Sequence, residues 1–296
     1  LSSGTKAGSG HAVSSTQVCK GMEISLEEIP VTRASIEDEI KNFMVFQFNG
    51  TTLESTLVRK DYYSNSSVEN VQLNNSVVKN RIIVIANASQ ETFATITVGS
   101  TLDDFNKLGI TYNEESPGHF PLFNVAPSGR IMFAGSTDMI VSANKQADIM
   151  LYRTVARVRI DLFIVTDMQN KGYTNWTCQF MNIPKKSFYH SIGHTAVFPV
   201  ANVGYANYKS DVIPAFSLNI EKYLPVNLQH PVPFTTPEKR GTNAPAGATY
   251  LQIMGVEVTN GTISKSVVYQ VHLGSNFAND YSVSPNYTYK YTIRIT

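Results

Sequence analysis

The feature that most constrains the fold of this chain is the alternation of apolar and polar residues in short segments. The clearest example is 287–295, where tyrosine or isoleucine occupies every second position. Successive side chains of a strand point to opposite faces of a sheet, so a period of two predicts a strand with one buried face. The segment 22–27 shows the same pattern, since apolar Met22, Ile24 and Leu26 alternate with polar residues.

Other segments of this kind are spread over the chain. Strands are predicted at 43–48, 81–86, 92–98, 130–134, 139–142, 179–182, 195–199, 250–258 and 267–273. One or two short helices are predicted. In the convincing one Ser100 caps the start, an apolar stripe runs from Leu102 to Leu108, and Gly109 ends the helix. Many short strands separated by Gly, Asn and Pro turns predict an all-β protein built of antiparallel β-sandwiches.

The length of 296 residues suggests two domains, at about 150 residues each. The alternation between 148 and 165 would extend about 50 Å as one strand, too long for one ordinary sheet, so we place the domain junction there. The Ser/Gly-rich start of the chain has little apolar surface to bury. We therefore expect a flexible tether at 1–20, an N-terminal β-sandwich at 21–147 and a C-terminal β-sandwich at 148–296.

Charge and hydropathy exclude several classes of protein. The chain has 24 Lys and Arg against 23 Asp and Glu and no basic run, so we expect no nucleic-acid partner. No apolar run reaches the roughly 18 residues that a membrane-spanning helix needs. The N-terminal stretch has no apolar signal region, and we expect that any signal segment has been removed.

Two residue pairs have the spacing of a known chemical motif. His190 and His194 stand four apart, as zinc ligands on a helix do, but they lie in a strand-rich region and are expected to be solvated loop residues. Ser76 and Lys79 have the spacing of an acyl-enzyme serine and its lysine, yet that chemistry needs a helix to bring the two together. Neither pair therefore predicts catalysis or a metal site.

Acidic residues at 37–39 and 103–104 could pair for acid–base work or bind calcium, but a solvated loop and a helix N-terminus explain them equally. The chain also lacks nucleophile-elbow, phosphate-loop and dinucleotide motifs, so we expect no enzyme activity and no cofactor. The two cysteines, Cys19 and Cys178, lie far apart in sequence. They either form a disulfide in an oxidising compartment or remain a tail thiol and a buried thiol.

Several segments together resemble the fimbrillins of Bacteroidales, the subunits of outer-membrane pili, and most closely their minor, Mfa-like branch. The matching pieces are EIKNFMVFQFNG at 39–50, IIVIAN at 82–87, LYRTVARVR at 151–159, PEKRG at 237–241, ATY at 248–250, VYQVHLG at 268–274, DYSV at 280–283 and NYTY at 286–289. They span the chain from about Met22 to Thr296. No single piece is specific, and the resemblance rests on their order and spacing.

This resemblance implies two transthyretin-like β-sandwich domains and export to the cell surface as an outer-membrane lipoprotein precursor. It also implies trimming after a basic residue near the N-terminus and polymerisation by a donor strand. The sequence departs from the pattern at Cys19, because the preceding residues are not a lipobox. The lipid is therefore expected on residues that precede Leu1.

Two site predictions follow for the N-terminal region. Arg33 and Ala34 flank the expected cleavage by a trypsin-like protease, because the nearby proline marks an exposed link. The segment 22–29, with Met22, Ile24, Leu26 and Ile29 on its apolar side, is expected to be a removable first strand of the N-terminal sandwich. Its departure would open a groove that a strand of another pilus subunit fills.

The position in the pilus and the ligand are open at this stage. Only Thr296 follows the last predicted strand, so we expect a subunit that accepts a donor strand without supplying one, as a tip adhesin would. The ligand would be a glycan or a protein of a host or bacterial surface. One alternative is a surface carbohydrate-binding module without a polymer role, and a second is an export-linked hydrolase.

Overall fold

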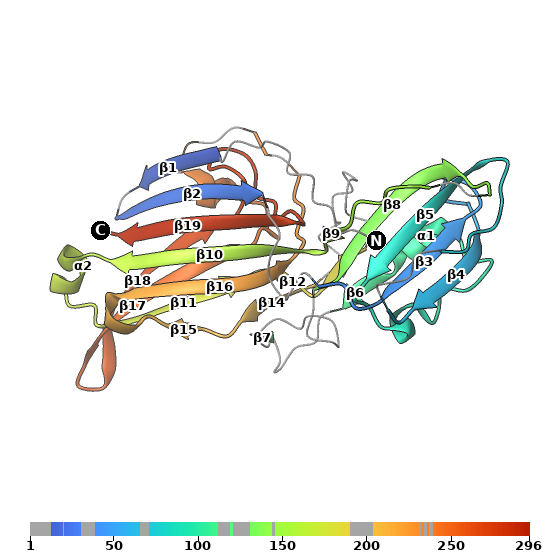
Figure 1. Cartoon of the computed structure of the whole chain (residues 1–296). Helices are drawn as coiled ribbons and strands as arrows, with labels where there is room; N and C mark the ends of the chain where they lie inside the picture. The colour runs from blue at the N-terminus through green and yellow to red at the C-terminus, as the bar shows by residue number, and fades with distance from the viewer. Residues whose placement is uncertain are drawn as a thin grey trace.

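The computed structural model describes residues 13–19, 21–30, 39–65, 71–111, 119–120, 131–143, 146–189, 204–230, 232–233, 236 and 239–296. The described residues form strands, mostly in antiparallel sheets, and only short helices, which confirms the all-β class. Figure 1 shows two lobes, each built around its own strands.

The N-terminal lobe is built on a five-stranded sheet in the order β4-β3-β5-β8-β9. In that order the strands span Leu57–Tyr63, Phe43–Phe48, Lys79–Ala86, Phe133–Ile140 and Tyr152–Arg153. Every residue of the central strand β3 is buried. On one face of the sheet, Phe46 packs against Phe93 and Phe105, whose ring centroids both lie 5.0 Å from its own.

These two aromatic residues belong to the 3₁₀ helix η2 (Gln90–Phe93) and the helix α1 (Leu102–Lys107). The short helix predicted between residues 100 and 109 is confirmed as α1, but its cap lies one residue later than expected. Thr101, rather than Ser100, accepts the hydrogen bond from the Asp104 amide in a complete capping box. Gly109 follows the helix and begins β6 (Gly109–Thr111).

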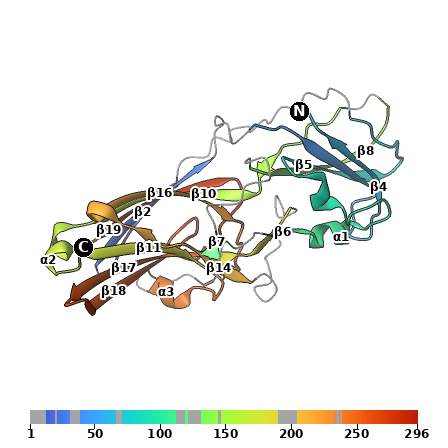
Figure 2. The same ribbon diagram turned by 90° about the horizontal axis from the view of Figure 1, so that it is seen from below.

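The C-terminal lobe is a sandwich of two sheets, which lie as two layers in Figure 2. The first sheet has the order β1-β2-β19-β10-β16, with bounds Val13–Cys19, Met22–Pro30, Tyr287–Ile295, Val155–Ile164 and Ser217–Pro225. The second has the order β15-β11-β17-β18, with bounds Asp211–Val212, Asn175–Met181, Tyr250–Thr259 and Thr262–His272. Within the first sheet β19 runs parallel to β10 and antiparallel to β2.

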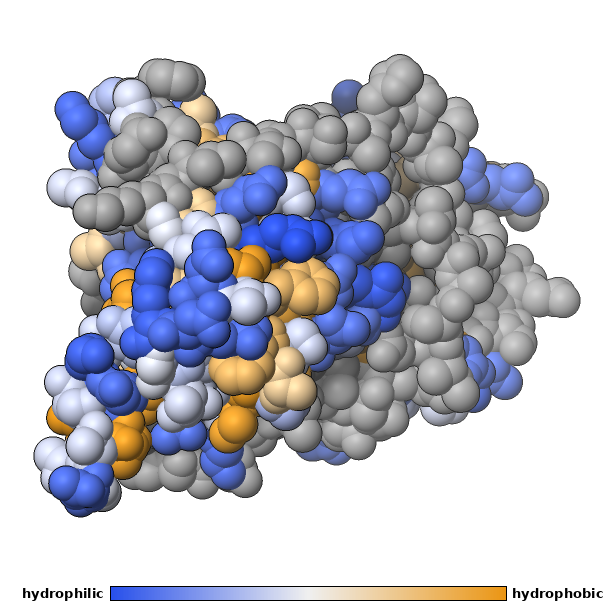
Figure 3. Space-filling view, turned by 90° about the vertical axis from the view of Figure 1, so that its left-hand side faces the viewer, coloured by the Kyte–Doolittle hydropathy of each residue, from blue (hydrophilic) through white to orange (hydrophobic). Residues whose placement is uncertain are grey.

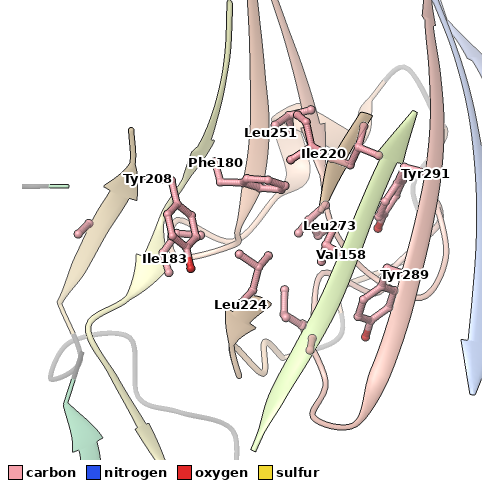
Figure 4. Packing of buried hydrophobic residues seen from close by; sticks show 14 of the residues in the cluster. Val158, Phe180, Ile183, Tyr208, Ile220, Leu224, Leu251, Leu273, Tyr289 and Tyr291 are labelled. Carbon is pink, nitrogen blue, oxygen red and sulfur yellow. The ribbon is translucent and has the colours of Figure 1, made fainter. Parts of the chain in front are cut away.

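The core of this lobe is filled by the inward faces of both sheets. Figure 4 shows Tyr289 and Tyr291 of β19 beside Val158 of β10, with Phe180 and Leu251 of the other sheet across the core. All five side chains are buried. The alternation in 287–295 therefore marks a buried strand face, as predicted, because its aromatic positions fill the interior of the sandwich.

The two lobes are connected through short elements. Strand β9 belongs to the N-terminal sheet and β10 to the C-terminal sheet, and only Thr154 separates them. A second connection is the antiparallel pairing of β6, which follows α1, with β13 (Lys186–Phe188). A three-stranded sheet has the order β12-β14-β7, with bounds Ile183–Pro184, Tyr205–Tyr208 and His119–Phe120. The remaining elements are α2 (Thr166–Asn170), η4 (Pro214–Phe216) and α3 (Arg240–Asn243).

Several predicted strands differ from those in the structure. The predicted strand at 92–98 is wrong, since this segment contains the end of η2 and a series of turns. The segments 130–134 and 139–142 contribute to one strand, β8. The segment 195–199 lies outside the described residues.

Candidate functional site

Strand β2 lies in the sheet of the C-terminal lobe, between β1 and β19 (Figure 1). It pairs with β19 along its whole length, from Met22 opposite Ile295 to Pro30 opposite Tyr287. The inward side chains of β2, Met22, Ile24 and Leu26, are all buried. They complete the hydrophobic layer begun by the inward residues of β19. We call the surface of β19 that β2 covers the β2 seat; it consists of residues 287–295.

This position corrects the prediction that β2 belongs to the N-terminal sandwich. The alternation at 22–27 does specify a strand with one buried face, and that part of the prediction is confirmed by Met22, Ile24 and Leu26. Alternation does not specify which sheet edge the strand joins, because several edges offer an equivalent ladder of backbone groups. The partner of this strand is the last strand of the described fold, far away in sequence.

The tether prediction is also wrong in part, because Val13–Cys19 form β1 and pair with β2 over seven residues. Although β1 is poor in apolar residues, its backbone hydrogen bonds are made with the edge that β2 presents. Cys19 stands opposite Met22, so the connection between the two strands, which contains Gly21, is tight. Gly21 has a φ of 78°, which a residue with a side chain rarely adopts.

The turn of this hairpin touches both sheets of the sandwich. Thr296 donates a backbone hydrogen bond to the carbonyl of Gly21, with an N–O distance of 2.8 Å. A Cβ atom on Gly21 would lie 3.1 Å from the hydroxyl oxygen of Tyr269, which belongs to β18 in the opposite sheet. The β1–β2 hairpin (13–30) therefore closes one end of the sandwich as well as extending its first sheet.

The outward face of β2 carries acidic residues where β19 carries basic ones. Glu27 stands opposite Lys290, and their charged atoms are 3.9 Å apart. Glu23 stands opposite Arg294, whose guanidinium lies over the ring of Phe163. This pairing was missed at the sequence level. The sequence did contain a signal for it. The acids Glu23 and Glu27 are four residues apart, the bases at 290 and 294 are also four residues apart, and all four lie between apolar positions.

The other predicted site residues are described unevenly. Arg33 and Ala34 lie outside the described residues, so the cleavage site stays a prediction. Ile29 belongs to β2 and stands opposite Thr288, but only its backbone is described. The three residues that the structure brings together at one edge are thus Met22, Ile24 and Leu26.

The residue pairs considered for catalysis gain no support from the described geometry. Ser76 bonds through its hydroxyl to Asn80 and Val78 in a turn that precedes β5, so no helix presents Lys79 to it. The acids at 103–104 lie at the N-terminus of α1, where Asp104 completes the capping box. His190 and His194 lie outside the described residues. Among the described residues no cluster of three His, Cys, Asp or Glu could hold a metal ion.

The second cysteine is a free, buried thiol in β11. Burial, with a smaller contribution from the Asp211 carboxylate, raises the pKa of the Cys178 thiol to about 12. A thiol in this state is protonated and unreactive at neutral pH. Of the two alternatives for the cysteines, the structure therefore supports a buried thiol at Cys178 and not a disulfide with Cys19.

The tyrosines of β19 and the exposed apolar residues of the C-terminal lobe bear on the alternative of a carbohydrate-binding module. Tyr289 and Tyr291 are buried in the core and cannot stack on a sugar, whereas Tyr287 is partly exposed. Figure 3 shows the end of this lobe, where apolar residues lie in groups between hydrophilic ones. The exposed large apolar residues of the β17–β18 hairpin are Val258, Ile263 and Val268. No helix among the described residues is long and apolar enough to cross a membrane.

Comparisons with known proteins give a partial family match and a clear likeness of fold. A family described as a domain of unknown function (DUF4906) matches residues 222–293, which run from the end of β16 to β19. No curated protein matches the chain.

Three solved structures share the fold over most of the chain. A candidate cell adhesion protein from Bacteroides eggerthii DSM 20697 superposes with a TM-score of 0.52 at 13% identity, covering 87% of this chain and 91% of that one. The tip fimbrial protein Mfa3 from Porphyromonas gingivalis, truncated at its C-terminus, gives 0.51 at 13% identity, covering 87% and 94%. A fimbrilin (FimA) from Porphyromonas gingivalis W83 gives 0.51 at 11% identity, covering 89% and 94%. This chain therefore has the fold of the Bacteroidales fimbrial and cell adhesion proteins.

Proposed function

We propose that this protein is a subunit of a bacterial surface pilus with an adhesive role, and that it works by binding other subunits rather than by catalysis. The observation that carries the proposal is the β2 seat, where an N-terminal hairpin completes a sheet of the far lobe. A short connection, 31–38, joins this hairpin to the N-terminal lobe. The likeness of fold to fimbrial proteins supports the same role.

Cleavage after Arg33 would leave the hairpin held by non-covalent contacts alone. Loss of the hairpin would expose the apolar positions of the β2 seat and a row of unpaired backbone groups on β19. Burial of Met22, Ile24 and Leu26 is worth about 1.5–3 kcal/mol for each side chain. Only a strand of similar pattern could restore this free energy, so an uncovered seat would drive the addition of a strand from another subunit.

The cellular setting follows from the same proposal. A trypsin-like protease would act on the chain at the cell surface, after export of a lipoprotein precursor to the outer membrane. The partners would be other pilus subunits, together with a glycan or protein ligand on a host or bacterial surface. Within the pilus we propose the tip position, in line with the likeness to the tip protein Mfa3.

A mixing experiment tests this function. The full chain is treated with a trypsin-like protease and mixed with a stalk subunit from the same source, and the assemblies are separated by size and analysed by mass spectrometry. We expect chains that carry one copy of this protein at the end, and an Arg33→Ala variant that stays monomeric. Many copies along the shaft would exclude the tip position, and identical behaviour of the two proteins would exclude activation by cleavage.

Glycan binding without assembly is the competing function. It predicts that the full chain binds a glycan array as a monomer and that protease treatment leaves its oligomeric state unchanged. The site would have to lie away from the buried tyrosines of β19. Array binding by the Arg33→Ala variant, combined with no polymer from the treated wild type, would favour this alternative.

A further inference from the structure

The outer face of the first sheet of the C-terminal lobe has an uneven distribution of charge once β2 is set aside. On β10, β16 and β19 the outward-facing charged residues are four basic and two acidic: Arg157, Arg159, Lys290 and Arg294, with Asp161 and Glu221. The described outward acids of β2 are Glu23 and Glu27, and they bring this face to neutrality. The strand thus supplies the carboxylates that the rest of the face lacks.

The charges are arranged in register across four strands. Glu27 stands opposite Lys290, Lys290 is the partner of Arg159, and Arg159 is the partner of Glu221. Arg159 and Arg157 both bind the Glu221 carboxylate, the former with an N–O distance of 2.7 Å. Glu221 is therefore already occupied by two guanidinium groups. Lys290, placed beside Arg159, has Glu27 as its paired carboxylate.

A second row of facing residues across the sheet contains one acid, one base and one aromatic ring: Glu23, Arg294 and Phe163. Arg294 stands opposite Glu23, and on its other side it lies over the Phe163 ring, 5.2 Å from the centroid. Between the two rows, Ser25 stands opposite Thr292, so no charge faces a charge there. The strand β1, on the far side of β2, has the sequence VSSTQVC and offers no charged residue. The described acids of β2, Glu23 and Glu27, are thus matched to β19 alone.

Opposite charges facing one another across two strands stabilise the pair by about 0.2–1 kcal/mol, and like charges destabilise it. We propose that the β2 seat selects its strand by charge: the partner is an extended segment with apolar residues at alternate positions and, on its other face, carboxylates four residues apart that meet Lys290 and Arg294. This proposal rests on strand exchange at the seat, as described above. It adds the chemistry of the incoming segment and its register.

Register is the property that this charge pattern controls most directly. A shift of two residues keeps the apolar face of an incoming strand inward but moves both carboxylates away from their basic partners. The apolar contacts alone would therefore permit several registers, and the pair of charges distinguishes one of them. Incoming strands with Lys or Arg at these positions meet like charges and bind more weakly.

The first test uses hydrogen exchange on the full chain, with the hairpin still attached. In a Glu23→Lys, Glu27→Lys variant, we expect the amides of Lys290–Arg294 to exchange at least about 10-fold faster than in the wild type at low salt. The difference should shrink in 0.5 M salt, because exposed charges are then screened. The matched control is Glu257→Lys, which reverses a partly exposed carboxylate that pairs with Lys265 on the other sheet. Equal exchange in the two variants would overturn the proposal.

The second test measures binding of free strands. Residues 31–38 of the full chain are replaced by the recognition sequence of a specific protease, the folded protein is cut there, and labelled peptides of residues 21–30 are added. The native peptide should enter the seat, the Glu23→Gln, Glu27→Gln peptide about 3-fold or more weakly, and the double Lys peptide at least about 10-fold more weakly. A Lys290→Glu protein should prefer the Glu27→Lys peptide, whereas Lys265→Glu, whose partner is Glu257 on the other sheet, should not.

The outcomes separate this proposal from the proposed function. If the native peptide binds and all charge variants bind equally well, strand exchange stands and selection by charge is wrong. If no peptide enters the cut protein, strand exchange at this seat is contradicted, and the hydrogen-exchange comparison alone decides whether charge fixes the position of β2.

Discussion

Leu26 of β2 lies directly opposite Tyr291 of β19, and the two side chains keep only 1% and 0% of their surface exposed. The hydroxyl of Tyr291 donates to the carbonyl of Gly274 and accepts from its amide, at 3.0 and 3.1 Å. The ring that Leu26 covers is therefore held in place from the far side of the core. A gap left by a smaller residue at position 26 could not be closed by movement of this ring.

The first prediction concerns this contact. Leu26→Ala should lower the free energy that holds the hairpin on the lobe by about 2–5 kcal/mol, towards the upper end because the site cannot collapse. Urea unfolding and hydrogen exchange of β19 measure the change. Ile263→Ala, which removes an exposed apolar side chain of β18, is the matched control and should have an effect below about 0.5 kcal/mol. Equal effects would show that β2 is not buried as described.

The second prediction compares two glycines with nearly the same backbone angle. Gly21 has a φ of 78° and Gly261, in the turn between β17 and β18, a φ of 79°. A Cβ at Gly21 would meet the Tyr269 hydroxyl, whereas a Cβ at Gly261 meets nothing within 4 Å. Both Ala variants should lose stability of about 1 kcal/mol from strain, and Gly21→Ala should lose more.

The additional loss at Gly21 should shrink in a Tyr269→Phe background, because that change removes the atom in closest contact, at 3.1 Å, and leaves the ring carbon at 3.3 Å. Thermal unfolding of the four variants completes the comparison. If Gly261→Ala proves the more harmful change, the packing of the hairpin turn against β18 is incorrect.

The third prediction is cleavage after Arg33. Limited trypsin digestion of the folded chain should give a first fragment that begins at Ala34, as read by N-terminal mass spectrometry. Lys60 should resist, because its ammonium donates to the carbonyls of Phe93 and Ile96 from within β4. Arg59, bound to Asp61 in the same strand, should resist as well. Early cutting at these two residues in place of Arg33 would contradict the proposed activation.

The fourth prediction is a loss of stability in mild acid. His272 is packed between Tyr250 and Tyr281, and burial, with a further contribution from the Arg240 charge, lowers its pKa to about 4 from an ordinary value of 6.5. The unfolded chain therefore binds more protons than the folded one between these values. The stability is fully present above pH 6.5 and falls as the pH drops towards 4, by on the order of 3 kcal/mol.

Urea unfolding at several pH values measures this dependence. His272→Gln should be less stable at pH 7 but should lose the slope between pH 6.5 and 4. His230→Gln, a change at an exposed histidine, should keep the slope of the wild type. A slope that survives in His272→Gln must come from another group and would remove His272 as its cause.

Local patterns predicted much of the fold, and the failures have identifiable causes. The strands at 43–48 and 287–295 were found because all but one residue of the first, and every second residue of the other, is apolar, which is a local property. The segment 92–98 also alternates, but it forms turns. Its buried residues, Phe93 and Ile96, are three positions apart, which is not the spacing of one strand face. The hydroxyls of Ser89 and Thr92 bond to each other there and fix the turn.

The position of the candidate site could not be predicted from local sequence patterns, and the cause is a different one. The apolar face of β2 was predicted from Met22, Ile24 and Leu26, but the choice of β19 as its partner depends on contacts between the two ends of the described fold. The backbone hydrogen-bonding groups are much alike at all sheet edges, so hydrophobic alternation does not specify which strand becomes the partner. The complementary charges of Glu27 and Lys290 were the one local clue, and they are informative only when the two strands are considered as a pair.

The pairing of β2 with β19 has a consequence for how the protein forms. During synthesis, the hairpin of 13–30 emerges before nearly all of the fold, yet its partner strand emerges after the N-terminal sheet and the second sheet of the sandwich. Contacts between residues so distant in sequence form late, because a long loop must close first. The hairpin therefore has no partner strand during most of the synthesis of the chain. In that period its apolar side is accessible to chaperones or to the β19 strand of another chain, until β19 of the same chain has been synthesised.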